Sequence, residues 1–201
     1  MGAAFMLSLP QPMLFTEPSE FFFTAGYDSP LGHLDLAISE RGLAMVVLQN
    51  RWAASHGSRL ASTGNVRWIE EPERFRDVCC QLDEYFAGTR RQFDLPLDLR
   101  GPEFHQRCGQ ALLRIPYGQT WSYAQLAAAV GSPLASRAVG QANHHNPVAI
   151  IVPCHRVIAS DGSLAGFGGG LTAKEFLLTL EGARFRTSLP EQGSLFGEFA
   201  V

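Results

Sequence analysis

The chain has 201 residues, of which 46% are hydrophobic and 17% charged, with a formal net charge of −3. This composition is that of a folded globular protein with one large domain or two small ones, and the overall charge alone does not favour a nucleic-acid partner. The charge is uneven: residues 1–100 hold 9 basic and 13 acidic side chains, whereas residues 101–187 hold 7 basic and 4 acidic ones. The later part of the chain is therefore the basic one.

No apolar run reaches the ~20 residues of a membrane span. The start of the chain lacks a basic segment and is interrupted by Pro10 and Pro12, which argues against a signal peptide. We therefore expect a cytoplasmic protein without a membrane partner. The four cysteines have neither disulfide-framework nor zinc-ligand spacing, and His33 and His56 lack ligand partners nearby. We predict no metal and no cofactor.

The first half predicts a small antiparallel sheet packed with a helix. Residues 1–20 resemble a flexible lead. Residues 21–49 are rich in aromatic and β-branched residues and have turn signals at Ser29-Pro30 and Arg41-Gly42, which indicates about three strands. Residues 50–70 indicate a loop. Residues 72–86 carry apolar side chains at helical spacing, which predicts a helix that Gly88 ends. A last short strand and a linker are expected in residues 89–102. We place a domain at 21–100.

The second half predicts a mostly helical domain at 101–187, followed by a flexible tail at 188–201. A helix is expected from Phe104 to Arg114, and a capping box of Ser122 and Gln125 begins the next. Ser132-Pro133 should begin a third helix that ends near Asn143, giving a helix-turn-helix candidate. Thr172 and Glu175 indicate another capping box, for a helix that ends at Gly182. The expected fold class is α/β in the α+β sense.

The strongest chemical feature is the segment Pro153-Cys154-His155-Arg156-Val157. A thiol attacks as its thiolate, and a nearby base or positive charge favours that form. Glu181 could orient the histidine as a third member. By itself, however, a Cys-His pair is more often a buried structural cysteine beside a surface histidine.

A series of motifs around this segment resembles the O6-alkylguanine-DNA alkyltransferases, the methylated-DNA–protein-cysteine methyltransferases. The similarity is strong over residues 101–185. In the first half, the clearest local match is Asp28-Ser29-Pro30-Leu31-Gly32. The motifs follow in family order: Ile115-Pro116-Tyr117-Gly118, Thr120-Trp121-Ser122-Tyr123, Ser136-Arg137-Ala138-Val139-Gly140, Asn146-Pro147, Ile151-Val152-Pro153-Cys154-His155-Arg156-Val157-Ile158, Gly169-Gly170-Leu171 and Lys174-Glu175. The resemblance implies a ribonuclease H-like first domain and a second domain that binds DNA.

The resemblance also implies roles for individual residues. Cys154 would be the alkyl acceptor, His155 the base acting through a water, and Glu181 the group that orients the imidazole. Asn146 would fix the active-site turn, and Tyr123 would donate to N3 of the guanine. The pocket would be formed by the following residues: Val157 and Cys154 through their carbonyl groups, Phe167, Gly168 and Gly169. Phe167 stands where many family members have tyrosine.

The implied DNA interface lies on the helix that carries Arg137. Its small neighbours Ser136, Ala138 and Gly140 would allow close approach to the minor groove, and Tyr123 would also face the DNA. Arg137 would enter the space left by the flipped base. Without the resemblance, a face of small residues more often packs on another helix.

The function predicted from these features is single-turnover DNA repair. An alkyl group would pass irreversibly from O6-alkylguanine, and from O4-alkylthymine, in duplex DNA to Cys154. The alternative is a non-catalytic alkyltransferase-like protein that senses the lesion; such relatives lack the acceptor cysteine, which is present here. A cysteine hydrolase and a helix-turn-helix regulator are weaker alternatives.

The tail segment Gln192-Gly193-Ser194-Leu195-Phe196 resembles short peptides that dock on the bacterial sliding clamp. We therefore also consider the clamp as a partner. A monomer is expected.

Overall fold

The computed structural model describes residues 20–48 and 66–187. Strands β1 (Glu20–Ser29), β2 (Gly32–Ser39) and β3 (Gly42–Leu48) form an antiparallel meander, which confirms the expected sheet and both turns. The prediction of a loop through residue 70 was wrong at its end. There β4 (Val66–Glu70) pairs in parallel with β1, so that the strand order is β3-β2-β1-β4.

The sheet separates two apolar clusters because alternate side chains of a strand point to opposite faces. On one face Leu34, Leu36 and Val46 join the main core. On the other, Phe22, Ala37 and Val47 form a smaller cluster. The main core also takes in residues of α2, α3, α4, α5 and α6, so the sheet and the later helices share one interior.

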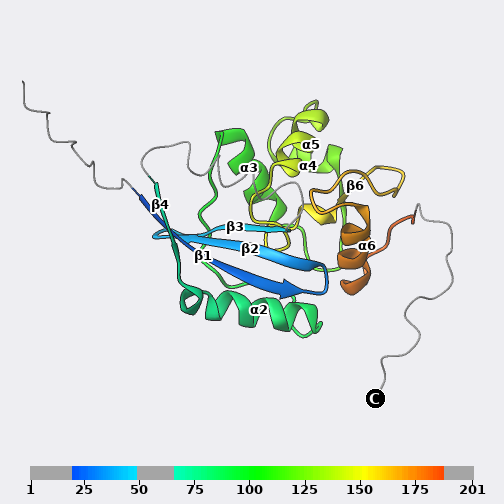
Figure 1. Ribbon diagram of the computed structural model, residues 1–201. Helices are drawn as coiled ribbons and strands as arrows, with labels where there is room; N and C mark the ends of the chain where they lie inside the picture. The colour runs from blue at the N-terminus through cyan, green and yellow to red at the C-terminus, as the bar shows by residue number, and fades with distance from the viewer. Residues whose placement is uncertain (1–19, 49–65, 188–201) are drawn as a thin grey trace, which may run out of the picture.

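The short helix η1 (Pro72–Phe75) leads into α2 (Arg76–Phe86), which lies against one face of the sheet (Figure 1). The buried side chains of these two elements are Phe75, Val78, Leu82 and Tyr85. The expected strand within 89–102 is reduced to one isolated bridge between Leu97 and Leu43. Pro96 has no N–H to continue a ladder. A Cβ at Gly42 would lie 2.3 Å from the Pro96 carbonyl oxygen, so this approach requires glycine.

The later part is mostly helical, as expected. Its elements are α3 (Glu103–Leu112), β5 (Trp121–Ser122), α4 (Tyr123–Ala129), α5 (Ser136–His144), η2 (Cys154–Arg156), β6 (Val157–Ile158) and α6 (Leu171–Leu180). Helix α4 begins with the predicted capping box of Ser122 and Gln125. Helices α4 and α5 pack together as the expected helix-turn-helix pair, and α3 packs against both.

Two helix starts differ from the prediction. Helix α5 begins at Ser136, because Ser132 and Pro133 belong to a turn closed by the Ala135 N–H on the Ser132 carbonyl. Helix α6 follows Gly170, which has φ 89° and supplies no side-chain cap. Instead of capping, the Glu175 carboxylate accepts a hydrogen bond from Thr187 at 2.7 Å. Gly182, with φ 67°, ends this helix as predicted.

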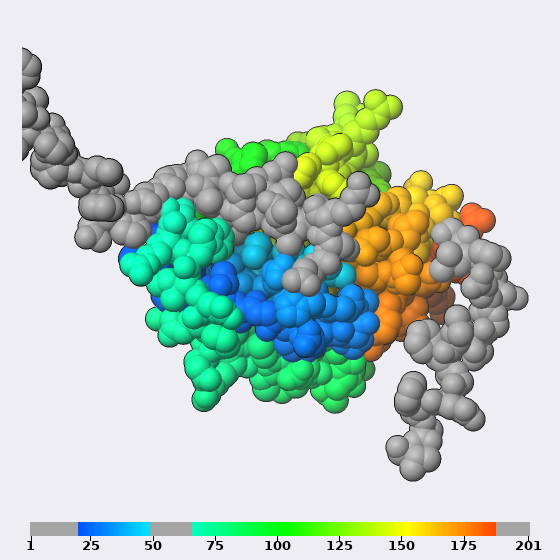
Figure 2. All heavy atoms as spheres, in the orientation of Figure 1, coloured from blue at the N-terminus to red at the C-terminus, as the bar shows by residue number. Residues whose placement is uncertain are grey.

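The two parts of the chain join along β3. Val46 donates its N–H to the Pro147 carbonyl at 2.8 Å and accepts from the Ala149 N–H at 3.0 Å. In Figure 2 the blue atoms of the sheet adjoin the orange atoms of the C-terminal part. This join holds the segment before Cys154 against the sheet. Within residues 20–48 and 66–187, no helix is long and apolar enough to cross a membrane.

Candidate active site

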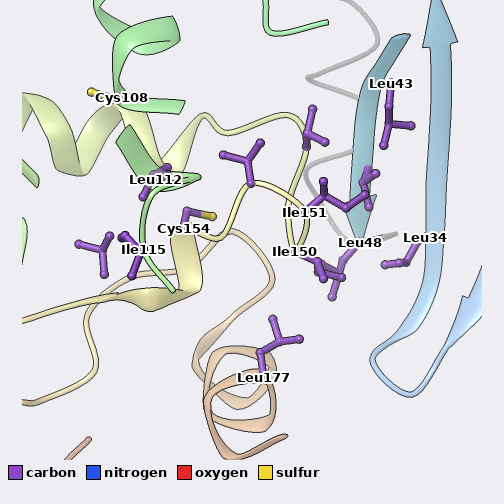
Figure 3. Close-up of a cluster of buried hydrophobic side chains, with 14 of the residues drawn as sticks. Leu34, Leu43, Leu48, Cys108, Leu112, Ile115, Ile150, Ile151, Cys154 and Leu177 are labelled. Carbon is purple, nitrogen blue, oxygen red and sulfur yellow. The ribbon is translucent and has the colours of Figure 1, made fainter. Parts of the chain in front are cut away.

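The segment that carries Cys154 is held by its buried apolar surroundings. Residues 148–152 are all buried, and Ile150 has φ 73°, a conformation that costs a β-branched residue ~1–3 kcal/mol. The Val152 N–H bonds to the Val148 carbonyl at 2.9 Å and closes the turn. Figure 3 shows Cys154 within the core, near Leu112 and Ile115, with Leu177 of α6 beyond it. The core therefore fixes the backbone at Cys154.

Asn146 connects this turn to the Cys154 sulfur. Its Nδ2 donates to the Val152 carbonyl at 2.8 Å and lies 3.1 Å from Sγ, while its Oδ1 accepts from the Val148 N–H at 3.1 Å. Burial raises the pKa of the Cys154 thiol, although Asn146 and Lys174 act in the opposite direction. The thiol is thus protonated at neutral pH and needs a base to become a nucleophile.

His155 and Glu181 form a buried pair behind the cysteine. His155 Nε2 lies 2.9 Å from Glu181 Oε1, and neither side chain is exposed. Burial lowers the pKa of His155, against the opposing effect of Glu181. A neutral imidazole therefore carries its proton on Nε2, where the carboxylate accepts it. The buried Nδ1 has no hydrogen-bond partner in the structure and can accept a proton.

Besides His155, four donor atoms from three residues form hydrogen bonds with the Glu181 carboxylate. Arg156 donates through Nε to Oε2 at 2.8 Å and through Nη2 to Oε1 at 2.9 Å. The Gly118 N–H reaches Oε2 at 3.2 Å and the Tyr85 hydroxyl reaches Oε1 at 2.7 Å. Burial opposes ionisation, but the hydrogen bonds and charges of His155 and Arg156 outweigh it and lower the pKa of Glu181 to about 2. The carboxylate is therefore ionised throughout the neutral range.

A small pocket opens beside the sulfur. It is lined by Leu48, Asn143, Asn146, Ala149, Cys154, Phe167, Gly168 and Gly169. Its volume is about 10 Å³, roughly the room for one water molecule. A Cβ at Gly169 would lie 2.9 Å from the Phe167 ring, so only glycine allows this wall to close so tightly.

Three of the predicted pocket residues, Phe167, Gly168 and Gly169, thus line the pocket with Cys154. Val157 does not line it. Val157 is buried in β6, where its carbonyl accepts from Lys174 Nζ at 2.6 Å. Lys174 Nζ also donates to the Ala165 carbonyl at 2.6 Å and so ties the pocket loop to β6.

The predicted DNA-facing residues gather at α4 and α5. Tyr123 begins α4, and a Cβ at Gly140 would be 3.7 Å from its ring, so the two residues pack together. Burial, and to a lesser degree the charge of Cys154, raise the pKa of Tyr123. Arg137 and Ala138 are exposed in the first turn of α5, and Ser136 and Gly140 are half-buried. Tyr123 therefore packs on the helix that carries Arg137 and lies close enough to Cys154 for the charge of the thiolate to affect its pKa.

Four polar residues of the site were not predicted from the sequence. They are Tyr85, Asn143, Arg156 and Lys174. The side-chain amide of Asn143 is buried against the pocket, and neither its nitrogen nor its oxygen has a partner. Helical spacing was a usable signal for Lys174, because 174, 177, 178 and 181 fall on one buried face of α6. Arg156 stands inside the motif that drew attention to Cys154.

The described part of the chain contains no group of three or more His, Cys, Asp or Glu side chains placed to hold a metal ion. Its cysteines, Cys79, Cys80, Cys108 and Cys154, are all free thiols. The site thus combines a buried thiol, a neutral imidazole with a free acceptor nitrogen, an ionised carboxylate and a narrow pocket. It is suited to nucleophilic transfer to the sulfur.

Comparison with known proteins places this arrangement in a family. A model described as the ribonuclease-like domain of 6-O-methylguanine DNA methyltransferase matches residues 23–99. A model of the DNA binding domain of the same family matches residues 103–183. The two matches together span nearly all the described residues.

Relatives and solved structures agree with these matches. A methylated-DNA–protein-cysteine methyltransferase of Mycobacterium leprae is 50% identical over 162 residues, which are 81% of this chain and 93% of the relative. One of Methanosarcina acetivorans is 45% identical over 80% of this chain and 99% of its own length. The crystal structure of Mycobacterium tuberculosis OGT in complex with DNA has a TM-score of 0.70 and 45% identity, and the match covers 81% of this chain and 92% of that one. The family expected from the motifs is confirmed: the chain belongs to the methylated-DNA–protein-cysteine methyltransferases.

Proposed function

We propose that this protein repairs duplex DNA by moving an alkyl group from O6 of guanine, and from O4 of thymine, to Cys154. The observation that carries the proposal is the buried Cys154 thiol beside a narrow pocket, with Asn146 on its sulfur and the His155–Glu181 pair behind it. The family membership supports both the reaction and DNA as the partner.

The proton of the thiol must leave before the sulfur can attack. His155 Nδ1 is the buried acceptor without a partner, and a water between it and Sγ would carry the proton. Glu181 holds the Nε2 proton in place and stabilises the imidazolium that forms. The sulfur then bonds to the alkyl carbon as the carbon–O6 bond breaks, and the base keeps that electron pair.

In this proposal the Tyr123 hydroxyl donates to N3 of the leaving guanine, so that the base departs without a full negative charge. The net change moves one alkyl group to sulfur and one proton to the base. Because the thioether is stable, each molecule acts once. No metal or cofactor is needed for these steps.

The target base must leave the duplex to reach Cys154. Arg137 is exposed at the start of α5. The small side chains of Ser136, Ala138 and Gly140 leave room beside it for another molecule to approach closely. We propose that this helix lies in the minor groove and that Arg137 fills the vacated space. The pocket holds about one water, so the wall formed by Phe167, Gly168 and Gly169 must move outward to admit the base. The unpartnered amide of Asn143 would then find a polar partner on the base or its water.

The test is to incubate the protein with duplex DNA that contains O6-methylguanine and to map the modified peptide by mass spectrometry. We expect one methyl group on the peptide that carries Cys154, and none on Cys79, Cys80 or Cys108. Cys154→Ala should abolish transfer while leaving DNA binding in place. A folded wild-type protein that binds the lesion tightly but acquires no methyl group would instead support the lesion-sensing alternative.

Four further expectations also remain proposals. The proposed binding segment for a sliding clamp is Gln192–Phe196, which lies outside the described residues. The domain limits at residues 100 and 187, the monomeric state and the cytoplasmic location also remain predictions from the sequence.

A further inference from the structure

One donor to Glu181 comes from the other half of the molecule. Tyr85 lies near the end of α2, within the ribonuclease-like part, whereas Glu181 follows α6. The Tyr85 hydroxyl donates to Glu181 Oε1 at 2.7 Å, the same oxygen that faces His155 Nε2 at 2.9 Å. The end of α2 and α6 lie near each other in Figure 1. A residue 96 positions away in the sequence thus contacts the carboxylate that holds the histidine.

Tyr85 is built into its place. Its side chain is fully buried, and its ring packs against Phe86, Phe93 and Tyr117 at centroid distances of 5.4, 5.2 and 6.2 Å. Burial, together with the Glu181 charge and hydrogen bond, raises the pKa of Tyr85 far above its usual range. The hydroxyl is therefore always protonated and acts toward Glu181 only as a donor.

We infer that Tyr85 is a positioning residue for the transfer reaction: its hydroxyl fixes Glu181 Oε1, and through it the orientation of His155. This inference rests on the proposed function. It gives the ribonuclease-like part a direct influence on the chemistry, although that part supplies no group that reaches the reacting sulfur in the proposed mechanism.

The hydrogen bond also shares the negative charge of Oε1 between two donors. Without the Tyr85 hydroxyl, the carboxylate would attract the His155 proton more strongly and raise the pKa of the imidazole. The other charged or titratable groups around the pair are Arg156 and Cys154 from the active-site turn, Tyr117 from the turn after α3, and Lys174 from α6. All of them stay unchanged when only the Tyr85 hydroxyl is removed.

The test compares Tyr85→Phe with Tyr117→Phe. The Tyr117 hydroxyl donates to the Leu180 carbonyl at 3.1 Å, next to Glu181 in sequence, and makes no bond to its carboxylate in the structure. Both variants lose one tyrosine hydroxyl at the same junction. The readouts are the single-turnover rate of methyl transfer as a function of pH and the melting temperature.

We expect Tyr85→Phe to slow transfer about tenfold, the loss expected for one hydrogen bond to a charged group. The acid limb of its pH profile should move to higher pH, because His155 would be protonated earlier. Tyr117→Phe should keep the wild-type profile and stay within about twofold of the wild-type rate. If Tyr85→Phe reacts with the rate and pH profile of Tyr117→Phe, even with a lower melting temperature, Tyr85 is only structural and the inference is wrong.

A second variant covers the case in which Tyr85→Phe does not fold. Replacing Tyr85 with a fluorotyrosine makes its hydroxyl a stronger donor while keeping its shape, and should move the acid limb to lower pH. An unmoved limb would overturn the inference. Failure of the proposed function itself is seen separately, as wild-type protein that leaves Cys154 unmethylated.

Discussion

Glu181 lies at the candidate active site and Arg137 on the helix proposed to face DNA, and the surroundings of the two side chains are opposite. Glu181 is 5% exposed and receives donors from His155, Arg156, Tyr85 and the Gly118 N–H. Arg137 is exposed in the first turn of α5. We therefore expect Glu181 to matter for both the fold and the proposed chemistry, whereas the exposed Arg137 is available to a partner and should contribute little to folding. Substitutions at the two places should separate these effects.

The largest expected effect is that of Glu181→Gln. The change would leave the buried Arg156 guanidinium without its counter-charge, which costs ~3–5 kcal/mol of the free energy of unfolding. Methyl transfer should fall as well, because the uncharged amide can no longer stabilise the imidazolium that forms on His155. Glu175→Gln is the control: Glu175 lies half-buried on α6 and accepts from Thr187, so its loss should stay within about 0.5 kcal/mol. Urea unfolding gives both values, and a loss below about 1 kcal/mol for Glu181→Gln would contradict the account.

The next effect is on the pH dependence of stability. Glu181 has a pKa of about 2 in the folded protein, against 4.5 for an unperturbed glutamate. Its contribution is present above the unfolded value and is lost as the pH falls toward 2. The difference corresponds to about 3 kcal/mol. His155, whose pKa burial lowers, acts in the same direction below its usual value of 6.5.

The check is to measure urea midpoints between neutral pH and pH 2.5 for the wild type and for Glu175→Gln, whose curves should run in parallel. A wild-type free energy of unfolding that stays constant down to pH 3 would show that Glu181 is not held ionised by its partners.

Local signals in the sequence predicted much of the fold. Gly32 and Gly42 follow the expected strand turns, and the Ser122–Gln125 capping box formed as predicted. These features depend on residues within a few positions of one another. The errors came from ambiguous local signals: a proline at 133 suits a turn as well as a first helical turn, and Gly170 starts α6 where Thr172 was expected to. Strand β4 was missed because its pairing partner, β1, lies more than 40 residues away.

The candidate site shows the same division. The motifs identified Cys154, His155, Asn146 and Glu181, and the structure brings all four together. Tyr85 could be predicted only as part of the apolar face of α2, because nothing in the sequence places its hydroxyl on Glu181. Arg156 and Lys174 were missed because charged side chains are ordinarily exposed, and only the fold shows that their partners are buried with them.

On the exposed side of α5, Arg137→Ala should change the free energy of unfolding by less than about 0.5 kcal/mol, because the side chain is exposed. Transfer from duplex DNA should slow by roughly tenfold or more, since an unstacked base step costs a few kcal/mol that Arg137 would offset. Transfer from the free alkylated base should be unchanged. Gln141→Ala, at an exposed position of the same helix, serves as the control. Equal losses on duplex and free base would argue against the wedge role.

The smallest expected effect is that of Phe167→Tyr. The Phe167 ring already walls the pocket, and the added hydroxyl would bring a donor near O6 without removing a contact. We expect a change in transfer rate of no more than about fivefold, the size of one neutral hydrogen bond. Phe176→Tyr, half-buried on α6 outside the pocket, controls for the general effect of a new hydroxyl. A complete loss of transfer would mean that the wall cannot move as proposed.

The central claim is that Cys154 accepts one alkyl group and keeps it. The most direct measurement is a titration of the wild-type protein with a large excess of duplex DNA that contains O6-methylguanine, with repaired DNA and protein mass followed in parallel. We expect repair to stop at one lesion per protein molecule, with every molecule carrying a single methyl group on Cys154. Repair that continues past one equivalent, or repaired DNA with an unmodified Cys154, would contradict it.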